Sequence, residues 1–248
     1  MRYRQALKTI DTLTHEEMLN IFDRASYSLA FSSLKTTPIE FLDTEASVAL
    51  LTFLLSKREL ELVRFVPVLL QWLSRYHHLL NPTKLIKMCS MLESACGEEL
   101  AILRLVSFFL KKMDPRRFKK LSVVPLASPF YFDPRLKAIV DQKLEREGFF
   151  MGLPPGLGLM VSASAFKPRD SNLLGDELLF KRNRQLRSRI LHGVNYRNDA
   201  ILLLTEHPEM SASELSDTLA LSYEPAHRLS LDVKHFRDFG YQLRIVGE

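Results

Sequence analysis

Residues 210–246 read MSASELSDTLALSYEPAHRLSLDVKHFRDFGYQLRIV, and this stretch decides which fold the C-terminal part of the chain can adopt. Ser211 and Glu214 have the spacing of a capping box, in which a serine and a glutamate satisfy free backbone N–H groups at a helix start. Leu215 and Leu219 follow one helical turn apart, on a common face. These residues predict a short helix that begins just after Ser211.

A second helix is predicted after a short break at residues 220–222. Pro225 stands in its first turn, where the missing N–H of proline costs nothing. Apolar residues at three- and four-residue steps mark its buried side, namely Ala226, Leu229, Val233 and Phe236. Two short helices joined by a tight turn are the helix-turn-helix pattern. After a turn at residues 238–240, the alternation over residues 241–246 predicts a strand, as in a wing.

At these residues the sequence resembles the winged helix-turn-helix superfamily, as found in bacterial transcription regulators. The resemblance covers residues 198–246 and rests on the spacing of S-E-L, L-A-L-S and A-H-R-L, without an invariant motif. Ala220 stands where many members have glycine, and Ala226 is smaller than the usual valine. The resemblance implies a double-stranded DNA partner. A homodimer is the common state of such regulators, because paired half-sites require two-fold symmetry.

The composition is that of a globular protein, and we expect a cytoplasmic one from the N-terminus and the cysteines. Hydrophobic residues make up 46% and charged residues 25% of 248 residues, and the formal net charge is +5. The N-terminus has no apolar core of signal-peptide length, and the runs 47–55 and 63–73 are too short to span a bilayer. Cys89 and Cys96 lie two turns apart on one predicted helix, which predicts two buried thiols and no disulfide between them.

Helix-start signals recur through the rest of the chain. Thr14–Glu17 is a capping-box candidate, and a helix is expected from Thr44 to Leu55. Ser56–Glu59 is a further candidate, for a helix that Pro67 kinks or divides. Asn81-Pro82, Asp114-Pro115 and Asp133-Pro134 each place a cap residue before a proline, and Gly148 is suited to end the last of these helices.

We therefore predict a mainly α fold in three parts. Residues 1–122 form an all-helical bundle, with a helical solenoid as the alternative although no fixed period is present. Residues 123–173 form a connector punctuated by proline and glycine, with one helix, and its apolar stretch FFMGLPPGLGLMV should pack on a neighbour. Residues 174–248 contain a basic helix followed by the winged helix-turn-helix domain.

Two runs of basic residues suit a phosphate backbone, whose neutralisation releases counterions. The first lies on a helix predicted over residues 175–191 and contains Lys181, Arg182, Arg184, Arg187 and Arg189. The second contains Lys111, Lys112, Arg116, Arg117, Lys119 and Lys120, opposed only by Asp114. A solvated helix face is the alternative for either run, and the position of the first run just before the helix-turn-helix favours a DNA role there.

The outer face of the second helix supplies the candidate base contacts. If Ala226 and Val233 face inward, Arg228 can reach a guanine edge or a phosphate, and His227 and Tyr223 can donate hydrogen bonds. Pairing of Arg228 with Glu224 and covering of the turn by Tyr223 are the alternative roles. The candidate DNA-binding residues are Lys181, Arg182, Arg184, Arg187, Ser222, Tyr223, His227, Arg228 and Arg244.

Motifs for catalysis, cofactors or metals are lacking in the sequence. His15–Glu17 lacks the second histidine of H-E-x-x-H, His77 and His78 diverge on a helix, and neither cysteine belongs to a C-x-x-C pair. No glycine pattern for phosphate binding is present, and Ser32–Lys35 matches S-x-x-K without its companion motifs. We therefore expect no enzyme, no cofactor and no metal.

Two functions remain. The leading hypothesis is a transcriptional regulator whose winged helix binds DNA, with the N-terminal helical domain used for dimerisation or signal input. The alternative is a scaffold whose winged helix docks a protein partner. It is favoured by the charge balance from Ile190 onward, where five basic residues face nine acidic ones.

Overall fold

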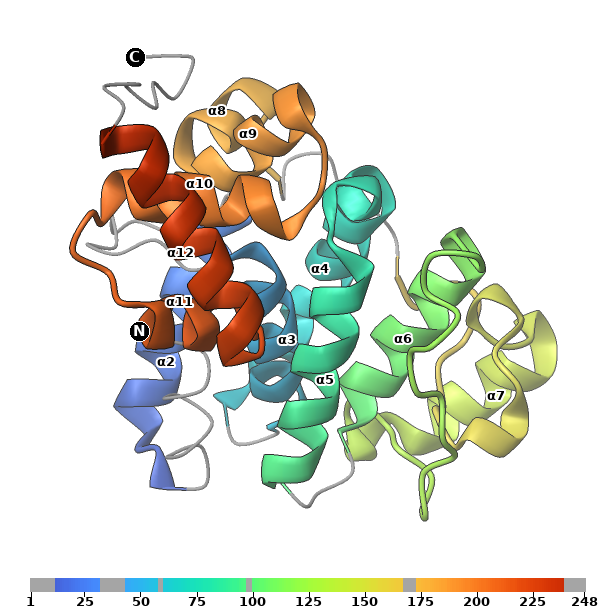
Figure 1. Cartoon of the computed structure of the whole chain (residues 1–248). Coiled ribbons are helices and arrows are strands. Elements are labelled where there is room, and N and C mark those ends of the chain that lie inside the picture. The colour runs from blue at the N-terminus through green and yellow to red at the C-terminus, as the bar shows by residue number, and fades with distance from the viewer. Residues whose placement is uncertain (1–11, 32–42, 58–59, 97–99, 167–172, 239–248) are drawn as a thin grey trace.

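The computed structural model describes residues 12–31, 43–57, 60–96, 100–166 and 173–238 (Figure 1). These residues are mainly helical, as expected, and they contain isolated bridges but no strand. The α-helices are α2 (His15–Ser28), α3 (Thr44–Ser56), α4 (Val66–Tyr76), α5 (Pro82–Cys96), α6 (Ala101–Met113), α7 (Lys137–Glu147), α8 (Asp176–Arg182), α9 (Arg184–His192), α10 (Tyr196–Glu206), α11 (Ala212–Leu219) and α12 (Tyr223–Asp238). Short 3-10 helices include η3 (Leu62–Phe65) and η4 (His77–Leu79).

Helix α3 is the centre of the main core. Every residue of α3 from Thr44 to Leu55 is buried, and the helix packs against α2, α5 and α6. The capping box predicted at the start of α2 is confirmed, because the Thr14 hydroxyl accepts from the Glu17 N–H at 3.2 Å and the Glu17 carboxylate accepts from the Thr14 N–H at 2.8 Å. The start of α5 at Pro82 and the burial of both cysteines without a disulfide between them are also as expected.

Two of the predicted helix starts are wrong. Ser56 ends α3, where its hydroxyl donates to the Thr52 carbonyl at 2.7 Å, and α4 begins at Val66 with Pro67 in its first turn. Asp114-Pro115 begins a series of turns and no α-helix. The chain bends there because Phe118 and Leu121 are drawn into the main core.

The stretch after α6 packs on the main core. Leu153, Leu157, Leu159 and Val161 are buried in it, and Phe150 stacks on Phe109 of α6 with ring centroids 6.5 Å apart. Helix α7 lies at the edge of the molecule beside this stretch and ends at Gly148, whose positive φ of 75° suits a glycine. The apolar segment 149–161 therefore packs on a neighbour, as its composition predicts.

Helices α10, α11 and α12 share a smaller core of Ala200, Leu204, Leu215, Leu219, Ala226 and Val233. The predicted capping box of α11 is confirmed, since Ser211 and Glu214 bond each other's backbone N–H groups at 3.2 and 2.8 Å. Residues 241–246, for which a strand is expected, lie outside the described residues. No helix in the described part of the chain is long and apolar enough to cross a membrane.

Ala220 fixes the angle between α11 and α12. Its backbone is left-handed, with φ 52° and ψ 34°, and its side chain is fully buried. The Leu221 N–H donates to the Ser216 carbonyl at 2.9 Å, and the Ser216 hydroxyl donates to the Leu221 carbonyl at the same distance. Alanine thus holds a conformation that usually selects glycine, and its methyl group fills a place in the core.

Substitution of Ala220 by valine should lower the free energy of unfolding by about 2 kcal/mol or more, because a branched side chain is strained at positive φ and overfills the site. Glycine should be nearly neutral, since relief of about 1 kcal/mol of backbone strain offsets about 0.8 kcal/mol for the missing methyl burial. Urea unfolding of Ala220→Val, Ala220→Gly and the control Ala212→Val measures this. Equal losses of stability for both valine variants would contradict it.

Candidate nucleic-acid interface and a buried ion cluster

The first half of α12 presents most of the predicted base-contacting residues to solvent. Ser222, just before α12, and His227 are exposed, and the Tyr223 side chain, 59% exposed, stacks on His227 with centroids 5.6 Å apart. Arg228 is 74% exposed and its guanidinium lies 2.5 Å from the Glu224 carboxylate. The structure thus brings Ser222, Tyr223, His227 and Arg228 to one end of α12, while Arg228 also takes its alternative partner. Arg244 lies outside the described residues.

The single basic helix expected over residues 175–191 is wrong, because Asn183 divides it into α8 and α9. Asn183 is fully buried and uses its whole amide group. Its Oδ1 accepts from the Leu186 N–H at 2.9 Å and caps α9, and its Nδ2 donates to the Ser28 carbonyl at 2.9 Å and to the Thr44 hydroxyl at 3.1 Å. An N-cap in the middle of the segment ends one helix and starts another.

The division spreads the basic side chains over different surroundings. Lys181 is exposed, whereas the Arg182 guanidinium lies over the Tyr27 ring, 4.5 Å from its centroid. Arg184 pairs with Glu206 at 3.1 Å. Arg187 is half-buried, and Arg189 is completely buried. The run of like charges in the sequence is therefore not one continuous basic face.

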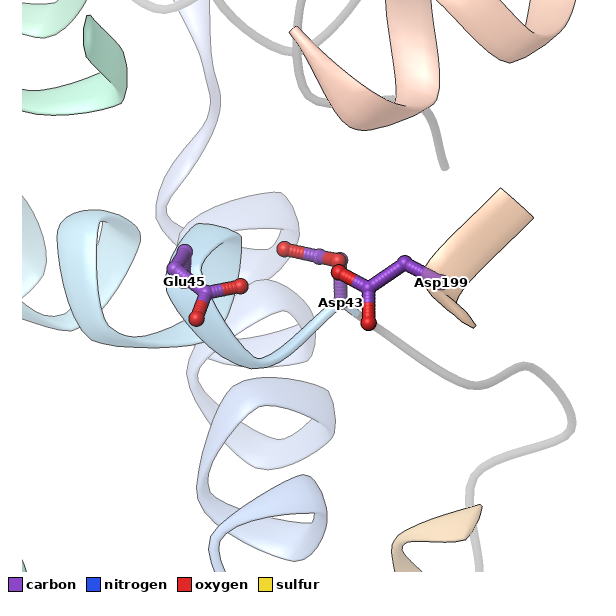
Figure 2. Close-up of side chains that lie close together, drawn as sticks. All are labelled: Asp43, Glu45 and Asp199. Atoms are coloured by element: carbon purple, nitrogen blue, oxygen red, sulfur yellow. The ribbon is translucent and has the colours of Figure 1, made fainter. Parts of the chain in front are cut away.

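Arg189 belongs to a cluster of five buried charges that the sequence did not reveal. Asp43, Glu45 and Asp199 turn their carboxylates toward a common centre, Asp43 and Glu45 from the start of α3 and Asp199 from the first turn of α10 (Figure 2). The Lys84 ammonium from α5 contacts all three, at 3.5 Å from Glu45 and 3.3 Å from Asp199, with Asp43 nearest. We call these five residues the ion cluster.

The Arg189 guanidinium uses all of its nitrogens within the ion cluster and beside it. It donates to both Glu45 oxygens at 2.6 and 2.8 Å, and to both Asp199 oxygens at 3.0 and 2.6 Å. A further bond of 2.9 Å reaches the Leu79 carbonyl of η4. Such paired bonds match the planar fork of a guanidinium and the geometry of carboxylates.

Neutral side chains complete the surroundings of the cluster. The Gln185 amide donates to Asp43 at 2.7 Å and accepts from the Thr44 N–H at 2.9 Å. The Asn81 N–H donates to Glu45 at 2.7 Å. The start of α3 is thereby connected to α5, α9 and α10, which are distant in the sequence.

The charges of the ion cluster shift the pKa values of its three acids in different directions. Burial alone would raise the pKa of Glu45 and of Asp199, but Arg189 and Lys84 lower both below their ordinary values. Burial raises the pKa of Asp43, and repulsion from Glu45 and Asp199 adds to this effect against the attraction of Lys84.

The three carboxylates have oxygens within 4.8 Å of one another, a spacing that a metal ion could use. Lys84 and Arg189 already meet these oxygens, and Lys84 itself contacts all three carboxylates. A metal would therefore add positive charge next to two buried cations. The carboxylate oxygens are instead used by the Lys84 ammonium and the Arg189 guanidinium. The role that fits the cluster is to hold the helices together.

Sequence reasoning missed the ion cluster because its members lie far apart, and Glu45 and Arg189 are separated by 144 positions in the sequence. One signal was present in the sequence. Eight of the twelve residues of Thr44–Leu55 are apolar, so the acid Glu45 near the start of this helix has to be exposed or paired inside.

No protein-family model matches the chain, and no curated protein or solved structure matches it.

Replacing Lys84 by methionine should lower the free energy of unfolding by about 3–5 kcal/mol, because it leaves three buried carboxylates with one cation. Adding Asp43→Asn to Lys84→Met should recover part of this stability, since it removes one uncompensated charge. Urea unfolding measures both, and Lys143→Met, at an exposed position on α7, is the control. A double variant less stable than Lys84→Met would show that the Asp43 carboxylate is not the charge left uncompensated by the loss of Lys84.

The ion cluster also predicts how stability depends on pH. Glu45 and Asp199 have lowered pKa values, so their stabilisation is complete above the unfolded value of about 4 and disappears as the pH falls through the folded value. Asp43 has a raised pKa, so its contribution is complete below about pH 4 and disappears as the pH rises through the folded value.

Urea midpoints measured from about pH 2.5 to about pH 8 separate these two effects, because one lowers stability as the pH falls and the other lowers it as the pH rises. Asp199→Asn should flatten the acid side of the profile, and Asp43→Asn should remove the decrease on its neutral side. An Asp43→Asn profile parallel to that of the wild type would show that Asp43 keeps an ordinary pKa.

Proposed function

We propose that the chain is a DNA-binding transcriptional regulator, in which α10–α12 form a winged helix-turn-helix module. Helix α12 lies in the major groove of double-stranded DNA. The observation that carries this proposal is the arrangement of α11 and α12 around the left-handed Ala220. Ala226 and Val233 hold one side of α12 in the small core, and the other side is free at its N-terminal end. In helix-turn-helix proteins, that end of the second helix contacts the bases.

The exposed residues suit the chemistry of base and phosphate contacts. Arg228 can bind the O6 and N7 atoms of guanine once it leaves Glu224, whose exposed ion pair is weak. Ser222, Tyr223 and His227 offer hydrogen bonds beside it. Lys181 and Arg184 are the members of the first basic run best exposed for phosphates, and Arg182 and Arg187 would have to leave partly buried sites.

In this proposal the rest of the chain supports the α10–α12 module. The ion cluster fixes α9 and α10 to α3 and α5, so that α12 is held on a rigid support. The N-terminal helical region would then serve for dimerisation or for signal input. Dimerisation would suit paired DNA half-sites, which have two-fold symmetry.

A protein-docking surface is the second candidate, and the outer face of α12 favours it. Two of its acids already neutralise arginines, in the pairs Arg228–Glu224 and Arg197–Asp232. Leu231 on the same helix is 48% exposed, close to the exposed Tyr223 in sequence. Aromatic and apolar side chains with little net charge are typical of the centre of a protein interface.

Duplex selection from a random pool, followed by fluorescence anisotropy, tests the proposal. Arg228→Ala should lower discrimination at one base pair by about 1–3 kcal/mol, because the paired hydrogen bonds to guanine are removed. The control is Arg135→Ala, which removes an arginine that is 87% exposed and also paired with an aspartate. The control should keep the wild-type affinity and preference.

Two outcomes would contradict the role of α12. Unchanged sequence preference in Arg228→Ala would show that this helix does not read bases through Arg228. If no duplex binds even at low salt, α12 is a docking surface, and Leu231→Ser should then abolish binding of a purified protein partner.

A further inference from the structure

Residues 111–120 read KKMDPRRFKK and form the end of α6 with the turn that follows, which we call the basic turn. Six of these residues are basic and one is acidic, which gives a net charge of +5. The whole chain also has a net charge of +5, so the other residues sum to zero. The net positive charge of the chain thus equals that of these ten residues, which lie outside the α10–α12 module.

The basic turn has a fixed shape. Arg117 lies against residues 77–80, where its guanidinium donates to the Leu80 carbonyl at 2.7 Å and to the His77 carbonyl at 3.4 Å. The Asp114 carboxylate accepts from the Arg117 N–H at 3.1 Å. Phe118 is completely buried in the main core. Asp114, Arg117 and Phe118 therefore anchor the turn, and the other cations are arranged on a rigid support.

Four cations of the basic turn face solvent, namely Lys112, Arg116, Lys119 and Lys120. The single acid of the segment is used by Arg117, and none of the four forms an ion pair within the described residues. Lysines in the last turn of α6 also stabilise its negative end, which accounts for Lys111 and Lys112. Helix stabilisation gives no reason for Arg116, Lys119 and Lys120, which lie beyond the helix.

We propose that the basic turn binds the phosphate backbone of a nucleic-acid duplex, as a sequence-independent surface separate from α12. Closely spaced, unpaired cations on a rigid turn neutralise phosphates and release counterions. Single-stranded nucleic acid is bound with exposed aromatic side chains on which bases stack, and the aromatic residue of this segment is buried. Contact with phosphates alone suits a duplex.

An anionic membrane is the competing partner for such a surface. Membrane-binding segments combine cations with an apolar face that enters the lipid. Here the apolar face of α6 and the Phe118 side chain are buried, which leaves Met113 as the exposed apolar side chain of the segment. The observations therefore favour the duplex.

The basic turn and the ion cluster meet at the same short segment. Arg117 binds the carbonyls of His77 and Leu80, and Arg189 binds the carbonyl of Leu79 between them. The turn is thus joined through residues 77–80 to α9, which leads into α10–α12. A duplex held at the turn touches a part of the protein that is rigidly connected to α12. The surface itself does not depend on base reading by α12.

The experiment compares two triple variants of the full chain. Arg116→Gln, Lys119→Gln and Lys120→Gln together remove three exposed cations from the basic turn. Lys137→Gln, Lys143→Gln and Arg146→Gln remove three exposed cations from α7 and change the net charge equally. Urea unfolding checks that both variants fold. Fluorescence anisotropy then measures their affinity for a random-sequence duplex of about 20 base pairs, a length that offers many phosphates along the helix, at several salt concentrations.

The basic-turn variant should bind about tenfold or more weakly at low salt, and its slope of log affinity against log salt should be less negative by about 0.9 for each phosphate that is no longer neutralised. The α7 variant should bind like the wild type. Equal affinities for both variants would overturn the proposal. So would wild-type binding to phosphatidylserine vesicles that disappears in the basic-turn variant, without binding to the duplex.

The same measurements separate this proposal, which stands apart from the proposed base reading, from the role of α12. Loss of duplex binding in the basic-turn variant, with Arg228→Ala unchanged in affinity and preference, supports the basic turn and contradicts base reading by α12. Loss of sequence preference in Arg228→Ala, with duplex binding by the basic-turn variant unchanged, supports base reading by α12 and contradicts the role of the basic turn.

Discussion

The bidentate contacts of the buried Arg189 guanidinium with Glu45 and Asp199 are the interaction on which the arrangement of this molecule depends. Moving such charges out of water costs several kcal/mol for each ion, and only good geometry and complete hydrogen bonding offset this cost. The ion cluster meets both conditions through Lys84 and Gln185. The ion cluster specifies one relative position of α3, α5, α9 and α10, because a shifted arrangement would leave a buried charge unpaired.

Local signals in the sequence predicted several helix starts correctly, because these signals act over a few residues, although the starts predicted at Ser56 and Asp114 are wrong. The capping boxes at Thr14 and Ser211 and the proline at the start of α5 form as expected, because their partners are near in the chain. Asn183 shows the limit. Its effect on the predicted basic helix comes from Ser28 and Thr44, which are 155 and 139 positions away, and no local pattern contains that information.

The sequence also predicted only part of the candidate nucleic-acid interface. The exposure of Tyr223, His227 and Arg228 followed from the spacing of the buried residues on α12. The distribution of positive charge did not, because counting residues along the chain cannot show which cations are used inside the fold. Arg189 and Arg182 look like surface charges in the sequence and are held by carboxylates and an aromatic ring, whereas the basic turn keeps four cations in solvent.

The ion cluster restricts how the sequence of this chain can change in evolution. Asp199 and Arg189 lie in the C-terminal helices, and their partners Glu45 and Lys84 lie in the helical core. A change at one of these positions is tolerated only when a partner changes with it, so the positions should vary together among related sequences. A protein that received the α10–α12 module and buried Asp199 would also have to supply cations in place of Lys84 and Arg189, because a buried acid without them is strongly destabilising.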